Sequence, residues 1–214
     1  METSMQKKIT ELKRLLQEAS DLSAVSSVLG WDQQVFMPPG GANARGRQMA
    51  ILAQLAQERA TNPRIGQLLD ELELVTQKLP FDNDDAALVR AARRKYERDV
   101  KIPPAFYAEM TEHLSAAFQV WAEARPANDF NKVRPYLEKT LDYSRRLADF
   151  FPGYQHIADP LIDFSDYGMK AADVQRVFAD LRQQLVPLIR KIGQQQPVDD
   201  SCLRKHFPKE QQMQ

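Results

Sequence analysis

The sequence has a single cysteine, few glycines and no excess of either charge. Cys202 cannot form an internal disulfide and cannot by itself build a zinc site, which favours a reducing compartment. We therefore expect a cytoplasmic protein. The 29 basic residues balance the 29 acidic ones, so no net field would attract nucleic acid or an anionic membrane. A nucleic-acid partner and a membrane partner are both unexpected.

Long apolar runs and strand patterns are also missing from the sequence. No stretch approaches the ~18 uncharged residues that a membrane helix needs, and the N-terminus leads into a charged amphipathic segment. No alternating β-branched run of strand length occurs. With 43% hydrophobic and 27% charged residues among 214, the chain can bury a sizeable core. The fold class is predicted to be all-α, an array of long amphipathic helices.

Apolar residues recur at three- and four-residue steps through most of the chain, which is the period of amphipathic helices. The first helix is predicted to end near Gly30, where a corner rich in Gly and Pro extends to Gly41. Later helices are predicted to begin at Pro63, at the acidic run 82–85 that supplies an N-terminal cap, at Pro104, at Asn128 or Asp129, and at Ala171. Pro187 should kink the last long helix.

The Gly30–Gln48 stretch offers the first candidate chemistry. Trp31 and Asp32 could recognise a ligand, but Trp31 is expected to pack on the core and Asp32 to accept N–H groups of the turn near Gln34. The glycines from residue 41 to 46 have the spacing of a phosphate-binding loop, yet no strand precedes them and no Lys-Ser or Lys-Thr pair follows. A tight turn is therefore predicted, with Arg45 and Arg47 directed toward solvent or a partner carboxylate.

Histidines and acidic residues form the second group of candidates. Glu109, Glu112 and His113 share one predicted helix, and an intrahelical charge pair on a solvated face is expected there. The signature His-Glu-x-x-His occurs nowhere, and His156 and His206 are isolated. A small acidic cluster, interpreted as helix capping before Ala171, consists of Asp159, Asp163 and Asp166.

The only basic concentration is interrupted by Glu97 and Asp99 and has no aromatic interleaving, so a solvated helix face is predicted rather than a nucleic-acid patch. Its members are Arg90, Arg93, Arg94, Lys95, Arg98 and Lys101. No nucleophile elbow surrounds any serine, and Cys202 is interpreted as an incidental thiol. None of these features predicts a catalytic site.

Several blocks together resemble one known family. They are Leu29-Gly-Trp-Asp-Gln33, Met37-Pro-Pro-Gly-Gly41 followed by Arg45, Arg47 and Gln48, Lys101-Ile-Pro-Pro104, Pro135-Tyr-Leu-Glu138 and Asp159-Pro-Leu-Ile-Asp163. The chain is similar over nearly its whole length to the carboxypeptidase Taq family of thermostable zinc metallocarboxypeptidases. The block from Trp31 to Gly41 is fairly specific in combination.

The resemblance implies a longer, almost wholly helical, homodimeric enzyme that removes C-terminal amino acids from peptides. In that family two histidines of His-Glu-x-x-His and a downstream glutamate hold zinc, and the motif's own glutamate acts as general base. Residues 1–214 contain none of these motifs. No catalytic, cofactor-binding or metal-binding residue is therefore assigned, and zinc is expected only in the full-length enzyme.

We therefore interpret residues 1–214 as a single helical N-terminal region of such a protein, inactive alone. Its expected partners are the missing C-terminal catalytic part, a second copy, and peptide substrates in the full-length enzyme. Residues 207–212 resemble the first turn of a further helix, which fits a part of a longer protein. The alternatives are a stand-alone helical interaction or dimerisation module, and a different enzyme with a small-molecule site at Trp31, Asp32, Arg45 and Arg47.

Overall fold

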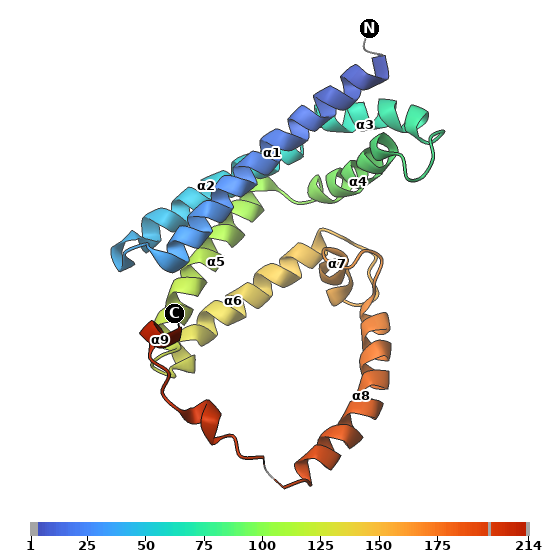
Figure 1. The fold of residues 1–214 in the computed structure, drawn as a ribbon. Helices are drawn as coiled ribbons and strands as arrows, with labels where there is room; N and C mark the ends of the chain where they lie inside the picture. The colour runs from blue at the N-terminus through green and yellow to red at the C-terminus, as the bar shows by residue number, and fades with distance from the viewer. Residues whose placement is uncertain (1–3, 197, 213–214) are drawn as a thin grey trace. The chain divides into compact units, whose positions relative to one another are not determined.

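The computed structural model describes residues 4–196 and 198–212, and within those ranges every regular element is a helix (Figure 1). The all-α prediction is confirmed. The elements are α1 (Ser4–Val35), η1 (Pro39–Gly41), α2 (Ala42–Ala60), α3 (Pro63–Thr76), α4 (Asp84–Asp99), α5 (Pro104–Ala124), α6 (Phe130–Asp149), α7 (Ala158–Asp163), α8 (Ala171–Gly193), η2 (Ser201–Arg204) and α9 (Lys209–Gln212). The chain divides into two compact units, Met1–Leu161 and Ile162–Gln214, which we describe separately.

Three helices of the first unit begin where a local capping signal predicts. The Asn62 side chain accepts the N–H of Arg64 at 2.9 Å, and a proline occupies the first helical position of α3. Asn83 accepts the N–H of Asp85 in the same way at the start of α4. Asp129 caps α6. These caps satisfy N–H groups that no intrahelical carbonyl can reach, so they fix the helix starts from local sequence.

Helix α1 continues past the predicted end at Gly30 to Val35, so that prediction is wrong. A glycine inside a helix costs only about 1 kcal/mol, and tertiary contacts beyond it offset that amount. The buried Gln33 donates from Nε2 to the Ser115 carbonyl at 3.2 Å and accepts from the Ser115 hydroxyl at 3.1 Å. The corner is therefore confined to residues 36–41, and α2 follows it at once.

The apolar core of the first unit is shared by α1, α3 and α4. Its members are Ile9, Leu12 and Leu15 from α1, Ile65, Leu68, Leu69 and Leu72 from α3, and Val89 and Ala92 from α4. Helix α2 packs between α1 and α5, and α6 packs on α5. Figure 1 shows α1 and α2 running side by side. Helix α5 therefore connects the α1–α2 pair to α6.

A buried glutamine fixes the start of α5. Gln57 of α2 donates from Nε2 to the carbonyl of Asp99 at 2.6 Å and to that of Ile102 at 2.9 Å. The Asp99 carbonyl ends α4 and the Ile102 carbonyl lies in the turn before α5, where carbonyls have no intrahelical partners. The side chain therefore satisfies two buried acceptors and sets where α5 begins relative to α2.

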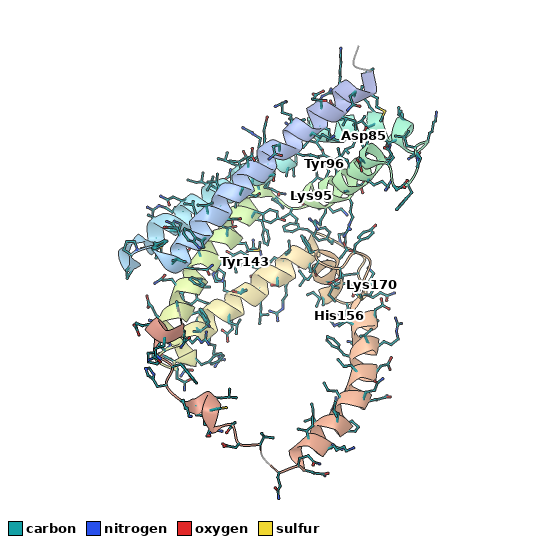
Figure 2. All side chains as sticks on the ribbon, in the orientation of Figure 1. Asp85, Lys95, Tyr96, Tyr143, His156 and Lys170 are labelled. Carbon is teal, nitrogen blue, oxygen red and sulfur yellow. The ribbon has the colours of Figure 1, made fainter. Side chains whose placement is uncertain are left out.

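The second unit consists mainly of α8, and at its start, where Figure 2 labels Lys170, the Asp173 carboxylate accepts the backbone N–H of Lys170 at 3.3 Å. Ala171 is the only buried residue among those that the structure describes in this helix. Six of the exposed large apolar side chains of α8 share one helix face; they are Val177, Phe178, Leu181, Leu185, Leu188 and Ile192, and we refer to them as the α8 stripe. Pro187 lies inside the helix, and its kink stays a prediction.

Residues 209–212 form the short helix α9, so the predicted helical turn near the C-terminus is confirmed. In the described part of the chain, no helix combines the length and the apolar character that crossing a bilayer requires.

Candidate functional site

Side chains of the Gly30–Gln48 stretch link α1 to α2. Arg45, whose side chain is only 12% exposed, donates to the Asp32 carboxylate and to the Leu29 carbonyl. The predicted partner carboxylate for Arg45 is thus confirmed. Arg47 instead donates to the Asn43 carbonyl of its own helix at 3.2 Å. Asp32 lies in the last turns of α1, which extends beside α2. The ion pair between Asp32 and Arg45 therefore links these two helices next to the corner.

Trp31 does not pack on the core, contrary to prediction. Its side chain is 55% exposed and meets the Phe36 ring edge-on, with ring centres 5.3 Å apart at 74°. Because α1 continues through residue 31, the indole shares an outward helix face with the exposed Val28 and Val35. With Asp32 and Arg45 used in the corner, these residues do not converge on a small-molecule site.

Arg45→Ala is expected to lower the free energy of unfolding by about 1.5–3 kcal/mol, because it removes hydrogen bonds of a largely buried charged group. Urea unfolding followed by circular dichroism measures this change. Arg47→Ala is the matched control, since this side chain is exposed and bonds only within its own helix. Its loss should stay within about 0.5 kcal/mol. Equal losses in the two variants would contradict a specific role for Arg45.

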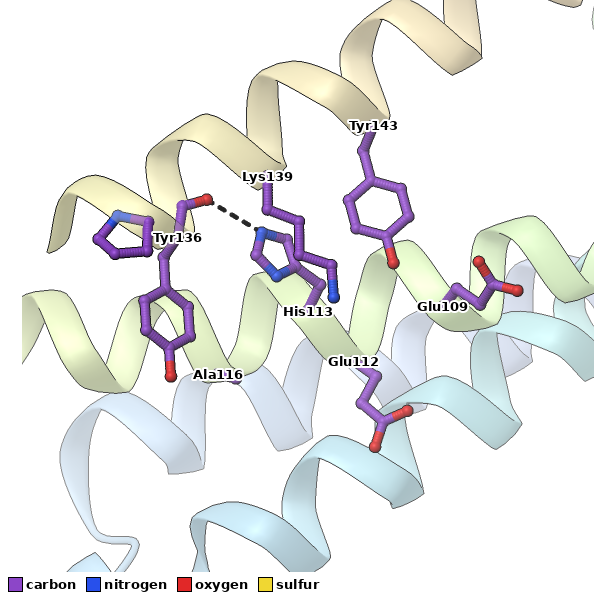
Figure 3. A pocket seen from close by; sticks show the side chains of 8 residues that line it. Glu109, Glu112, His113, Ala116, Tyr136, Lys139 and Tyr143 are labelled. Atoms are coloured by element: carbon purple, nitrogen blue, oxygen red, sulfur yellow. Dashed lines mark hydrogen bonds between the residues drawn. The ribbon is translucent and has the colours of Figure 1, made fainter.

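Several titratable groups surround a pocket between α5 and α6 (Figure 3). This α5–α6 pocket has a volume of about 660 Å³. It is lined by Glu109, Glu112, His113 and Ala116 of α5 and by Pro135, Tyr136, Lys139 and Tyr143 of α6. His113 and Tyr143 are buried, with ring centres 5.2 Å apart, and Lys139 is exposed. The pocket is therefore a charged opening over a buried aromatic floor.

His113 joins the two helices through one ring nitrogen. Nε2 lies 3.0 Å from the Thr140 hydroxyl oxygen and 3.2 Å from the Tyr136 carbonyl. Since the Thr140 hydroxyl donates to the same carbonyl at 2.8 Å, both groups around Nε2 can accept. Neutral His113 therefore carries its proton on Nε2, and Nδ1 remains an acceptor. Sequence reasoning noticed His113, but no local signal marks its partners on the next helix.

The predicted charge pair on a solvated face is wrong for His113. Glu109 instead accepts from Arg146 of α6 at 3.5 Å, while the imidazole is buried against α6. The interpretation fails because α6 covers that face of α5. Glu109 and His113, four residues apart, therefore both contact α6 and do not pair with each other.

Stability is expected to fall as the pH is lowered from about 7.5 to about 5.5, across the ordinary histidine pKa near 6.5. Burial lowers the pKa of His113, and the positive charge of Lys139 lowers it further, against the opposing hydrogen bond to Tyr136. The His113 pKa is therefore lower in the folded chain than in the unfolded chain. Neutral His113 contributes stability above the unfolded pKa, and this contribution is lost as the pH falls through the folded pKa. Urea unfolding midpoints across this range measure the effect.

His113→Gln should flatten that pH dependence, whereas His156→Gln should leave it unchanged. His156 is exposed, and its Nδ1 accepts the Ala158 N–H at 3.1 Å. An identical pH slope in the native protein and in His113→Gln would show that another group carries the titration.

The remaining acidic candidates satisfy local backbone groups. The buried Asp159 accepts the N–H groups of Gln155 and His156 at 3.3 and 3.1 Å, and Asp163 accepts the Gly168 N–H at 2.8 Å. Neither caps α8. Across residues 4–196 and 198–212, no group of three or more His, Cys, Asp or Glu side chains could hold a metal ion. The donors present there do not fit a zinc ion.

The basic concentration is only partly a solvated face. Arg93, with 18% of its side chain exposed, lies 2.6 Å from Asp70 and 3.3 Å from Glu73, both on α3. Lys95 forms an ion pair with the buried Asp99 one turn away. The interpretation was wrong for Arg93 because α3 presents two carboxylates to it. Arg93 therefore links α4 to α3, whereas the Lys95–Asp99 pair lies within α4.

The chain matches the family model described as carboxypeptidase Taq (M32) metallopeptidase over residues 11–214. Thermostable carboxypeptidase 1 of Thermus thermophilus is 34% identical over 208 residues, which cover 91% of this chain and 40% of that protein. Carboxypeptidase 1 of Bacillus subtilis is 29% identical over 199 residues. The chain therefore spans about 40% of the length of these relatives.

Solved structures give the same result. The crystal structure of BsuCP superposes with a TM-score of 0.90 at 28% sequence identity, over 97% of this chain and 41% of that one. The M32 carboxypeptidase of Deinococcus radiodurans gives a TM-score of 0.73 at 39% identity, with the same coverage. The helices described above are thus shared with part of these longer proteins.

Proposed function

Because this chain belongs to the carboxypeptidase Taq (M32) metallopeptidase family, we propose that it is the N-terminal helical portion of a zinc metallocarboxypeptidase. In this proposal the full-length protein hydrolyses C-terminal residues from peptides, and residues 1–214 are inactive alone. The observation that carries the proposal is the match over residues 11–214 together with coverage of only 40% of the Thermus relative. The sequence has three histidines, and none lies in His-Glu-x-x-His.

The α8 stripe supports a partner that covers it. Contiguous apolar surface is rarely left exposed on a soluble monomer and usually marks an interface. Leu181 and Leu185 are 51% and 41% exposed, and Ile192 is 62% exposed. The relatives have further chain beyond the matched portion, and we propose that this remaining portion packs on the stripe. The same observation disfavours a self-sufficient interaction module, which would cover its own apolar face.

The remaining parts of the proposal concern assembly and location. Zinc and the general base would come from the remaining portion, and the peptide would bind there as well. We further propose a homodimer in the full-length state and a cytoplasmic location, the latter because the single cysteine is free and exposed.

The purified 214-residue protein, supplied with zinc and a short peptide, is expected to release no C-terminal amino acid above the blank. Amino-acid analysis of the reaction measures this release. The full-length Thermus carboxypeptidase serves as the positive control in the same buffer. Zinc-dependent release by the 214-residue protein, abolished by a chelator, would overturn the proposal.

A further inference from the structure

The α5–α6 pocket contains charges that no other described residue neutralises. The Lys139 ammonium lies 5.7 Å from the centre of the Tyr143 ring, and in the described residues no carboxylate forms an ion pair with it. Glu112 likewise has no cationic partner within the described chain. Glu109 differs, because Arg146 donates to it. The pocket therefore presents one unpaired cation and one unpaired anion.

Hydrogen-bonding groups accompany these charges. Figure 3 shows Lys139 and Tyr143 both pointing from α6 toward α5. The Tyr143 ring is buried, yet its hydroxyl makes no hydrogen bond with a described residue and is not sealed from solvent. The hydroxyl can therefore donate into the pocket beside the ammonium. Ala116 and Pro135 add apolar lining.

This arrangement selects among ligand classes. An organic cation is disfavoured at the Tyr143 ring, because Lys139 and Arg146 already lie 5.7 and 5.2 Å from its centre. The other lining ring, Tyr136, has one face stacked on His113. A simple anion would leave Glu112 unpaired and would meet its repulsion. A ligand that carries both charges matches both groups. The volume of about 660 Å³ lies within the range of pockets that hold small molecules.

We propose that the α5–α6 pocket binds a free α-amino acid with an apolar side chain, its carboxylate on Lys139 and the Tyr143 hydroxyl and its ammonium on Glu112. The apolar side chain lies against Ala116 and Pro135. No residue of this pocket takes part in the proposed peptide hydrolysis. The binding proposal therefore stands or fails independently of the peptidase assay.

NMR titration of the 214-residue protein with L-leucine tests the proposal. The chain has three histidines, so labelling of histidine ring carbons gives a simple spectrum. The His113 signal should shift saturably, while the His156 signal should stay in place. Leucinamide lacks the carboxylate and N-acetylleucine lacks the ammonium. Each should bind about tenfold more weakly than leucine, because each loses hydrogen bonds between charged groups.

Lys139→Gln should weaken leucine binding about tenfold, whereas Arg145→Gln is the matched control and should bind normally. Arg145 is exposed on the same helix and does not line the pocket. The absence of a saturable shift in the native protein would overturn the proposal. Undiminished binding of both leucine derivatives, or native affinity in Lys139→Gln, would overturn it as well.

Discussion

Leu68→Ala is expected to lower the free energy of unfolding by about 2–5 kcal/mol, a large part of the stability of an ordinary domain. Leu68 is fully buried at 0% exposure, where α3 meets α1 and α4. Removing its outer carbons loses their transfer free energy and leaves a cavity that the three helices fill only in part. Urea unfolding followed by circular dichroism at 222 nm, a standard helix signal, measures the loss.

Leu74→Ala on the same helix is the matched control. This leucine is 71% exposed, so the same chemical change removes little buried surface and should alter stability by no more than about 0.5 kcal/mol. Both variants make the same exchange of helix propensity, which isolates burial as the cause of the difference. Similar losses of unfolding free energy in both variants would contradict the assignment of Leu68 to the buried core.

Local sequence predicted the helix starts well because the signals act over a few residues. Asn62 with Pro63, and Asn83 before two aspartates, satisfy N–H groups within their own first turn. No distant residue is needed for these contacts. The same holds for the all-α class, which follows from the period of apolar residues along the chain.

The end of α1 could not be predicted locally. Gly30 is a stop signal by propensity, but Gln33 finds its partner in Ser115, which is 82 positions away in sequence. The environment of His113 is equally non-local, because Tyr136 and Thr140 come from the next helix. The α5–α6 pocket therefore appears only when α6 is placed on α5. The family blocks identified the family without indicating this pocket.

Because the chain belongs to this family, we expect a chimera with a full-length relative to gain activity. Replacing the matching portion of the Thermus carboxypeptidase with residues 1–214 should give a zinc-dependent carboxypeptidase. The two portions are 34% identical over 208 residues, so the helical frame is shared. We propose that residues 1–214 supply the structural helices and that the remaining portion supplies the zinc ligands and the general base. Activity should therefore rise from the blank level of the isolated chain to clear peptide hydrolysis.

The α8 stripe offers a control for this chimera. Leu181→Asp places a charge on the face that we propose the remaining portion covers. Burial of an unpaired charge is strongly unfavourable, so activity or stability of the chimera should fall. The same substitution in the isolated chain should be nearly neutral, since residue 181 is 51% exposed there.

Release of C-terminal amino acids from a short peptide should be measured in parallel for the folded, zinc-loaded chimera and for the 214-residue protein. We expect chelator-sensitive release by the chimera and none by the 214-residue protein. A folded, zinc-loaded chimera without activity, or activity in the 214-residue protein alone, would contradict the proposed function.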